Sequence, residues 1–292
     1  MRKVFVSLGA AALVAGIGQA GGLNVRTAEA LGLVAAPDFA LSGELTQGGW
    51  ARGVAPRGTV GLTLNGKPVG VANDGGFLIA FDRDAGGAAQ LAARFADGRS
   101  AARALTIAPR AWKLEYIPIG PRPGAPPSAA FAIRRSAELA QINAARAVDH
   151  DSAGWRQRFI WPVYGRISGR FGSQRIYNGT PGSYHSGMDI ATGASGTPFV
   201  APADGVVILA ADSPFTLEGR LLMIDHGMGL NSAFLHCSSL AVKVGDVVRQ
   251  GQYLGKIGMT GRATGPHLHW SIKWRDSRLD PLLFTGPMAA RQ

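Results

Sequence analysis

Short runs in which apolar and polar residues alternate, separated by turns, fill residues 36–110. Residues 59–64 alternate and precede Asn65-Gly66, a dipeptide typical of two-residue hairpin turns. Further strand-like runs follow at residues 77–81 and 91–95. Regularly spaced short strands are typical of a β-sandwich. We therefore predict a small immunoglobulin-like β-sandwich here, whose role the residues do not indicate.

A change of pattern follows this region. Residues 118–127 are rich in proline, which predicts a stiff linker. Ser128 can then serve as the N-cap of a helix that runs to about Val148, because the apolar residues after it recur at roughly helical spacing. We assign linker and helix together to residues 111–158.

Strand-like patterns return after residue 159. Residues 267–274 follow the pair Gly265-Pro266 and are rich in aromatic and β-branched residues, which favours a strand. Alternate residues of a strand share a face. His267 and His269 therefore point the same way and Leu268 points the opposite way.

Two further groups carry metal-binding side chains. His185 and Asp189 stand four residues apart, but the Gly, Pro and Asn residues around them indicate a loop rather than a helix, and Gly187 would let the chain fold back. His236 ends another strand-like run and, by alternation, shares a face with Phe234. Each pair alone is a weak signal, since most such histidines are structural.

Together these groups predict a metal site. Imidazole and carboxylate are good zinc ligands, and a catalytic zinc site usually has three protein ligands and an open position. The groups offer three ligands and two spare imidazoles. His226 reads instead as a strand-end histidine satisfied by the backbone, and His150 as an exposed residue of the connecting segment.

The C-terminal part, residues 160–284, resembles the lysostaphin/LytM-type zinc endopeptidases, peptidase family M23. The matching motifs occur in the right order over more than a hundred residues, a little under half of the chain, at residues 168–172, 185–190, 196–206, 224–227, 244–252 and 258–270. We therefore expect a mainly β protein whose C-terminal domain, residues 159–286, is an M23-like antiparallel sheet with a groove, preceded by the β-sandwich and the linker helix.

The resemblance also implies the site. The zinc ligands correspond to His185, Asp189 and His269, and the two catalytic histidines to His236 and His267. Zinc would activate a water molecule for peptide hydrolysis, and the two histidines would orient it, accept its proton and stabilise the oxyanion. The implied substrates are peptide cross-links and stems of peptidoglycan. Relatives often carry Tyr at the position of Phe234, which we expect in the groove wall.

Two other functions stay open. Some relatives of this fold have lost metal ligands and activate other cell-wall hydrolases, but this chain lacks none of the ligands. A zinc peptidase that acts on proteins is the second alternative.

The N-terminus predicts export. Residues 1–20 combine a basic start, an apolar run from Val4 to Gly18 and a small-residue end, as in secretory signal peptides, with Ala30 as an alternative cleavage point. The apolar run is short for a membrane span, so membrane attachment would require an uncleaved signal. We expect a periplasmic or envelope protein.

Composition adds two constraints. The formal net charge of +11 favours polyanions, and anionic envelope polymers are candidate partners in addition to peptidoglycan. Nucleic acid is not expected, because no nucleic-acid motif accompanies the charge. The single cysteine, Cys237, cannot form an internal disulfide and reads as a buried hydrophobe. The oligomeric state is not indicated.

Overall fold

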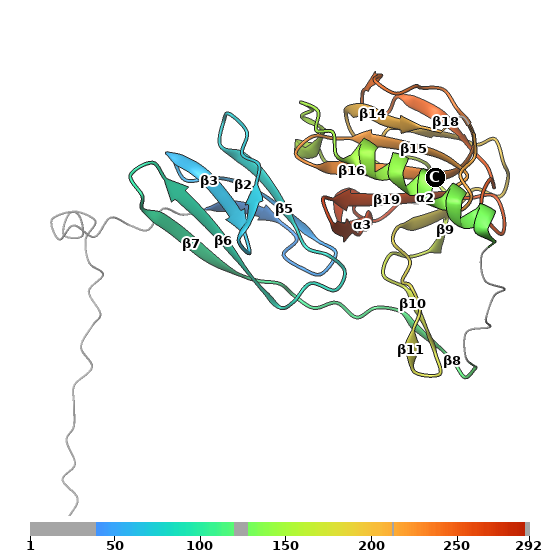
Figure 1. Cartoon of the computed structure of the whole chain (residues 1–292), viewed down its shortest axis with the longest axis horizontal. Helices are drawn as coiled ribbons and strands as arrows, with labels where there is room; N and C mark the ends of the chain where they lie inside the picture. Colours follow the sequence, from blue (N-terminus) through green and yellow to red (C-terminus); the bar gives the residue numbers. More distant parts are fainter. Residues whose placement is uncertain (1–38, 120–127, 212, 290–292) are drawn as a thin grey trace, which may run out of the picture. The chain divides into compact units, whose positions relative to one another are not determined.

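The computed structural model describes residues 39–119, 128–211 and 213–289. Residues Asp38–Gln292 form one compact unit. The predicted signal peptide and its alternative cleavage point lie outside the described residues. Strands dominate the described part, which confirms the mainly β prediction (Figure 1). No helix within these ranges is both long and apolar enough to cross a membrane.

The N-terminal region consists of two antiparallel sheets. One sheet has the order β1-β2-β5 and the other β4-β3-β6-β7. Their bounds are Ala40–Gly43 (β1), Trp50–Val54 (β2), Thr59–Leu64 (β3), Lys67–Val69 (β4), Gly76–Ala80 (β5), Ala88–Phe95 (β6) and Ser100–Thr106 (β7). The immunoglobulin-like topology stays a prediction.

Local chemistry explains the pairing in this region. Asn65 and Gly66 join β3 to β4 with φ values of 50° and 77°, the positive values that a two-residue hairpin turn needs. Alternate residues of β6 are buried, among them Leu91, and every residue of β5 is buried. Phe77 and Leu91 belong to the core cluster that the two sheets share.

A ten-stranded sheet forms the C-terminal region. Its main path has the order β17-β14-β15-β16-β19-β12-β9, with β13, β18 and β20 attached (Figure 1). The bounds are Arg166–Gly169 (β9), Met188–Ala191 (β12), Pro198–Val200 (β13), Gly205–Ala210 (β14), Arg220–Asp225 (β15), Leu230–Leu240 (β16), Val247–Val248 (β17), Tyr253–Ile257 (β18), Leu268–Trp274 (β19) and Ser277–Leu279 (β20). Two short helices complete the region, a 3-10 helix at Gly154–Arg156 (η1) and Leu282–Thr285 (α3).

One face of this sheet covers the main core. Trp270 of β19 pairs with Phe234 of β16, and the Phe234 ring lies 5.4 Å from that of Phe199. All three side chains are fully buried. The same core cluster continues into the N-terminal sheets, so the domain limits at 36–110 and 159–286 stay a prediction.

The other face is covered by the helix Ala129–Arg146 (α2). Ser128 caps it, because its Oγ accepts a hydrogen bond from the Phe131 amide at 3.1 Å, as predicted. Ile142 of α2 is buried in a second apolar cluster that the sheet completes with Ile208, Ala211, Phe215, Leu221, Met223 and Ala233. The helix therefore packs on the sheet rather than bridging two domains.

The segment between β7 and α2 also joins the C-terminal region. Leu114–Ile117 (β8) pairs in parallel with Gln174–Tyr177 (β10), which pairs with Thr180–Pro181 (β11). Arg110 binds Asp280 at 2.7 Å. A predicted linker thus becomes a strand beside the hairpin that precedes His185.

Candidate metal centre

Three predicted ligands converge on one point. His185 lies in the loop before β12, Asp189 lies in β12, and His269 lies opposite Asp189 in β19. Asp189 Oδ1 is 3.0 Å from His185 Nε2 and 2.8 Å from His269 Nδ1, and the two nitrogens are 3.1 Å apart. These three residues form a group whose ligand atoms could hold one metal ion.

Two glycines leave the space that this convergence needs. A Cβ on Gly169 of β9 would lie 2.3 Å from Asp189 Oδ2. A Cβ on Gly187 would lie 2.6 Å from His269 Nε2. The φ of Gly187 is not positive, so close approach, rather than the chain reversal expected from the sequence, is what requires glycine there. Gly169 belongs to a matched motif, but its role was not foreseen.

Backbone carbonyls orient the imidazoles. His185 Nδ1 lies 3.1 Å from the Arg170 carbonyl oxygen, which can only accept, so Nδ1 carries the proton and Nε2 faces Asp189. His236 Nδ1 donates in the same way to the Thr260 carbonyl at 2.8 Å. His267 Nδ1 donates to the Gly265 carbonyl, also at 2.8 Å.

The two remaining imidazoles stand beside the ligand group. The His236 and His267 rings are 4.8 Å apart, and the His236 ring is 6.3 Å from that of His269. His267 Nε2 lies 3.7 Å from Asp189 Oδ1. Because the Nδ1 atoms are protonated, each Nε2 is left as a base. The structure thus brings all five predicted residues together.

The expectation that Phe234 lines the groove is wrong. Phe234 is fully buried in the main core, whereas Leu235 pairs with His269. His236 has a φ of +66°, and the pairing of β16 with β15 is irregular close by. This left-handed residue breaks the alternation of the strand, so His236 does not share a face with Phe234.

The charges of the ligand group depend on one another. Burial opposes ionisation of Asp189, but hydrogen bonds from His185 and His269 outweigh it and hold the pKa of Asp189 far below its ordinary value. Burial likewise opposes protonation of His185, but Asp189 outweighs it and raises the pKa of His185. Burial lowers the pKa of His269, and it lowers the pKa of His236 to about 4.

The other singled-out residues lie apart from this group. His226 is fully buried, with Nδ1 donating to the Asp204 carbonyl and Nε2 accepting from Ser232 Oγ, so it is satisfied partly by the backbone as predicted. Cys237 is buried, and burial raises its pKa to about 12. His150 was expected to be exposed, but it is partly buried against Asp225.

Two cavities flank the centre. His185 lines one of about 730 Å³, between β9, the β10–β11 hairpin and Arg262. His269 lines the other, of about 310 Å³, between α2 and β19. One cavity therefore opens beside His185 and the other beside His269. The second cavity depends on α2, which sequence patterns did not place on this face.

Comparison with known proteins identifies relatives of this arrangement. Residues 183–281 match the family profile described as Peptidase family M23. The peptidoglycan DD-endopeptidase ShyA of Vibrio cholerae is 36% identical over 135 residues, 46% of this chain and 31% of that protein. The DD-carboxypeptidase/endopeptidase Mpg of Neisseria meningitidis is 35% identical over 125 residues, 43% of this chain and 28% of that protein.

A solved structure matches more of the chain. A crystal structure of an M23 peptidase from Pseudomonas aeruginosa is similar with a TM-score of 0.64 and 30% identity, covering 84% of this chain and 96% of that one. The similarity to this structure includes the region before the large sheet. The matches to ShyA and Mpg, in contrast, span less than a third of those proteins' length.

Proposed function

This chain belongs to peptidase family M23, and from that premise we propose that it is an exported zinc endopeptidase that hydrolyses peptide bonds in peptidoglycan cross-links or stems. The observation that carries the proposal is the convergence of His185, Asp189 and His269 beside two further imidazoles. The names of the relatives ShyA and Mpg support peptidoglycan as the substrate class.

The donor set fits zinc. Two imidazole nitrogens and one carboxylate oxygen are a ligand combination that zinc accepts, and three protein ligands leave a position open. Ligand atoms on one tetrahedral zinc ion lie roughly 3.4 Å apart, given bonds of about 2.1 Å. The observed separations of 2.8 to 3.1 Å need only a small outward shift. The raised pKa of His185 and the lowered pKa of Asp189 support a cation here.

His236 and His267 would have different roles in the hydrolysis. Bound zinc supplies Lewis acidity to the scissile carbonyl and to a water molecule. His236 is neutral at physiological pH, because burial lowers its pKa to about 4, so its Nε2 can accept a proton from the water. His267 Nε2 faces the same space and can hold the water or donate to the developing oxyanion once protonated.

Digestion of isolated peptidoglycan tests this proposal. Purified full chain with zinc should release peptide-cleaved fragments that mass spectrometry identifies, and the His267→Ala variant should release none. Bound zinc at one ion per chain without any release would contradict peptidoglycan hydrolysis. It would favour the regulatory role or a protein substrate instead.

A further inference from the structure

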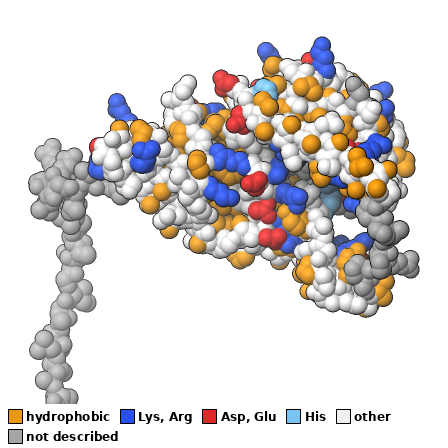
Figure 2. Space-filling model, viewed as in Figure 1, with side chains coloured by type: hydrophobic (Ala, Val, Ile, Leu, Met, Phe, Trp, Pro, Cys, Tyr) orange, Lys and Arg blue, Asp and Glu red, His pale blue; other side chains and the backbone are white. Residues whose placement is uncertain are grey.

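Positive charge is concentrated inside one cavity of this protein. On the face seen in Figure 2, the described Lys and Arg side chains are interspersed with Asp and Glu. Among the described residues that line the cavity between α2 and β19 are Arg135, Arg146, Lys273 and Arg278, with Glu218 as the acidic residue. Arg135 binds Glu218 through two hydrogen bonds of 2.6 and 2.8 Å. Among the described residues, no ion pair joins the side chains of Arg146, Lys273 or Arg278 to a carboxylate, and the nearest acidic charges to Lys273 are those of Asp276 and Asp82.

Arg146, the last residue of α2, is one of three arginines in the described ranges whose Nε is buried and unpaired, and it differs from the other two. Its Nε is buried and has no hydrogen-bond partner. Arg52 and Arg83 also leave Nε unpaired, but their terminal nitrogens donate to backbone carbonyl oxygens at 2.7 and 3.0 Å. Within the described ranges no ion pair to the Arg146 guanidinium occurs. A partly buried guanidinium whose buried Nε has no partner is unfavourable, so an anion placed there would be stabilised.

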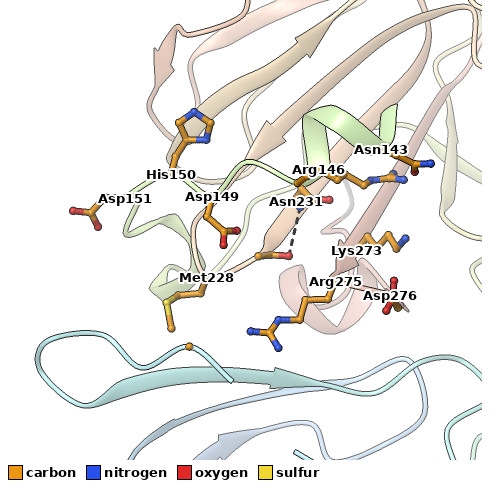
Figure 3. Close-up of a pocket in the computed structure, with 13 residues that line it drawn as sticks. Asn143, Arg146, Asp149, His150, Asp151, Met228, Asn231, Lys273, Arg275 and Asp276 are labelled. Carbon is orange, nitrogen blue, oxygen red and sulfur yellow. Dashed lines mark hydrogen bonds between the residues drawn. The ribbon is translucent and has the colours of Figure 1, made fainter. Parts of the chain in front are cut away.

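The two other cations face each other across strands. Lys273 of β19 pairs directly with Arg278 of β20, and like charges in such a pair repel. Burial lowers the pKa of Lys273, and the charges of Arg146 and Arg278 add to this effect. Figure 3 shows the Arg146 and Lys273 side chains extending toward the same side of the pocket, where Asn143 also lies.

The cavity begins at the metal centre. Alternate residues of β19, His269, Ser271 and Lys273, line it. A strand rises about 3.4 Å per residue, so Lys273 stands roughly 13 Å from His269 along the strand, the span of about four residues of an extended peptide. An extended substrate that crosses the centre therefore reaches the three cations.

A neighbouring cavity fixes where an anion would bind. Asn143, Arg146 and Lys273 line both cavities, which meet at these residues. The outer cavity, shown in Figure 3, is also lined by Arg275 and by the carboxylates of Asp149, Asp151 and Asp276, so the formal charges of its Lys, Arg and Asp residues balance. The excess positive charge therefore belongs to the inner cavity.

We propose that the cavity between α2 and β19 is a carboxylate-recognition subsite, in which Arg146, Lys273 and Arg278 bind an acidic group of the peptide that crosses the metal centre. This inference rests on the proposed function and specifies its substrate as an acidic peptide. Hydrogen bonds to charged groups are about twice as strong as neutral ones, so the subsite would discriminate between a carboxylate and its amide.

The test compares two forms of one substrate. A cross-linked peptide dimer released from peptidoglycan and the same dimer with its free carboxylates amidated are given to the zinc-loaded full chain. The wild-type kcat/KM should favour the carboxylate form by about tenfold or more. Arg146→Gln and Lys273→Gln should each reduce this preference and together abolish it. Lys243→Gln, which removes one exposed charge elsewhere, should keep the preference.

The outcomes separate this inference from the proposed function. Equal wild-type rates on both dimers, or a preference that survives the double substitution, would overturn the subsite. If neither dimer is cleaved, the proposed function fails, and calorimetric titration of both dimers into the His267→Ala variant decides the subsite. Tighter binding of the carboxylate form, lost on adding Arg146→Gln and Lys273→Gln, would support it, and equal binding would overturn it. Lys273→Gln alone decides the matter if Arg146→Gln does not fold.

Discussion

At the scale of single residues, the metal centre depends on a position where only glycine leaves enough space. Gly187 lies so close to His269 that a Cβ would stand 2.6 Å from its Nε2 and 2.6 Å from the Trp270 carbonyl oxygen. We expect Gly187→Ala to displace His269 and to lower zinc affinity and activity by about tenfold to a hundredfold. Zinc titration and peptidoglycan digestion measure both. Gly86→Ala, where the Cβ meets open space, is the control, and equal zinc affinity of the two variants would contradict the argument.

Replacement by alanine should have different effects at the ligands and at the flanking histidines. His269→Ala removes one of three converging ligand atoms, so both bound zinc and activity should be lost. His236→Ala leaves the ligand group intact and removes a base, so zinc should stay at one ion per chain while turnover falls by at least about a hundredfold. Elemental analysis together with a digestion assay distinguishes them. Full activity of His236→Ala would contradict its proposed role.

Acid should inactivate the protein through the ligands. Asp189 raises the pKa of His185, so protons compete with zinc for this ligand at or above the ordinary histidine pKa of about 6.5. Burial lowers the pKa of His236 to about 4, so the base stays neutral at that pH. Activity at limiting zinc should therefore begin to fall once the pH drops to about 6.5, and added zinc should move the fall to lower pH. Profiles of rate against pH at two zinc concentrations check this. The prediction would be refuted if activity fell at the same pH at both concentrations.

At the scale of elements, α2 is joined to the loop that supports His236. The buried Glu138 carboxylate accepts hydrogen bonds from the Thr216 amide at 2.7 Å and from its hydroxyl at 2.5 Å. Glu218, in the same loop, accepts a 2.8 Å hydrogen bond from the His236 amide through its backbone oxygen. The helix therefore stabilises the site through this loop.

Breaking that junction should cost stability. Glu138→Ala leaves the Thr216 amide and hydroxyl without their acceptor, a loss of about 2 kcal/mol. For a chain of this size that corresponds to a fall in Tm of about 4–8 °C. Thermal unfolding followed by circular dichroism measures it, with the exposed Glu44→Ala as the control. A Tm equal to that of the control would show that the junction does not hold the helix.

Comparison of the elements with the sequence patterns shows which structural features the sequence predicts. Local signals predicted the Asn65-Gly66 hairpin and the Ser128 cap, because the side chains that form them are neighbours in the chain. The five site residues were grouped by residue type and spacing, and the resemblance to a family divided them into ligands and catalytic histidines. The prediction that Phe234 and His236 share a face of their strand failed, because the positive φ of His236 interrupts the alternation of side chains. The helix α2 was expected to pack on a domain, but the face of the sheet that it covers was not found, because it depends on contacts with strands far away in the sequence.

At the scale of the whole molecule, the part before the large sheet packs against it. Trp50 of β2 packs on Phe284 of α3 with ring centres 5.1 Å apart, and one core cluster joins both regions. Trp112 packs against Phe171 at 5.7 Å, next to the β10 strand. The predicted separation into an appended sandwich and an independent peptidase domain would therefore leave apolar surfaces exposed on both parts.

A chain shortened to begin at about residue 155 tests this reasoning. It would lose α2 and uncover the cluster that includes Phe215, Leu221 and Met223, whose exposure is unfavourable by about 25 cal/mol per Å² of apolar surface. We expect the shortened chain to aggregate or to bind a hydrophobic dye, whereas the full chain with Ile142→Ala should stay folded with Tm reduced by several degrees. Size-exclusion chromatography and dye fluorescence measure this. A monodisperse shortened chain that unfolds near the Tm of the full chain would show that the large sheet needs neither the helix nor the N-terminal sheets.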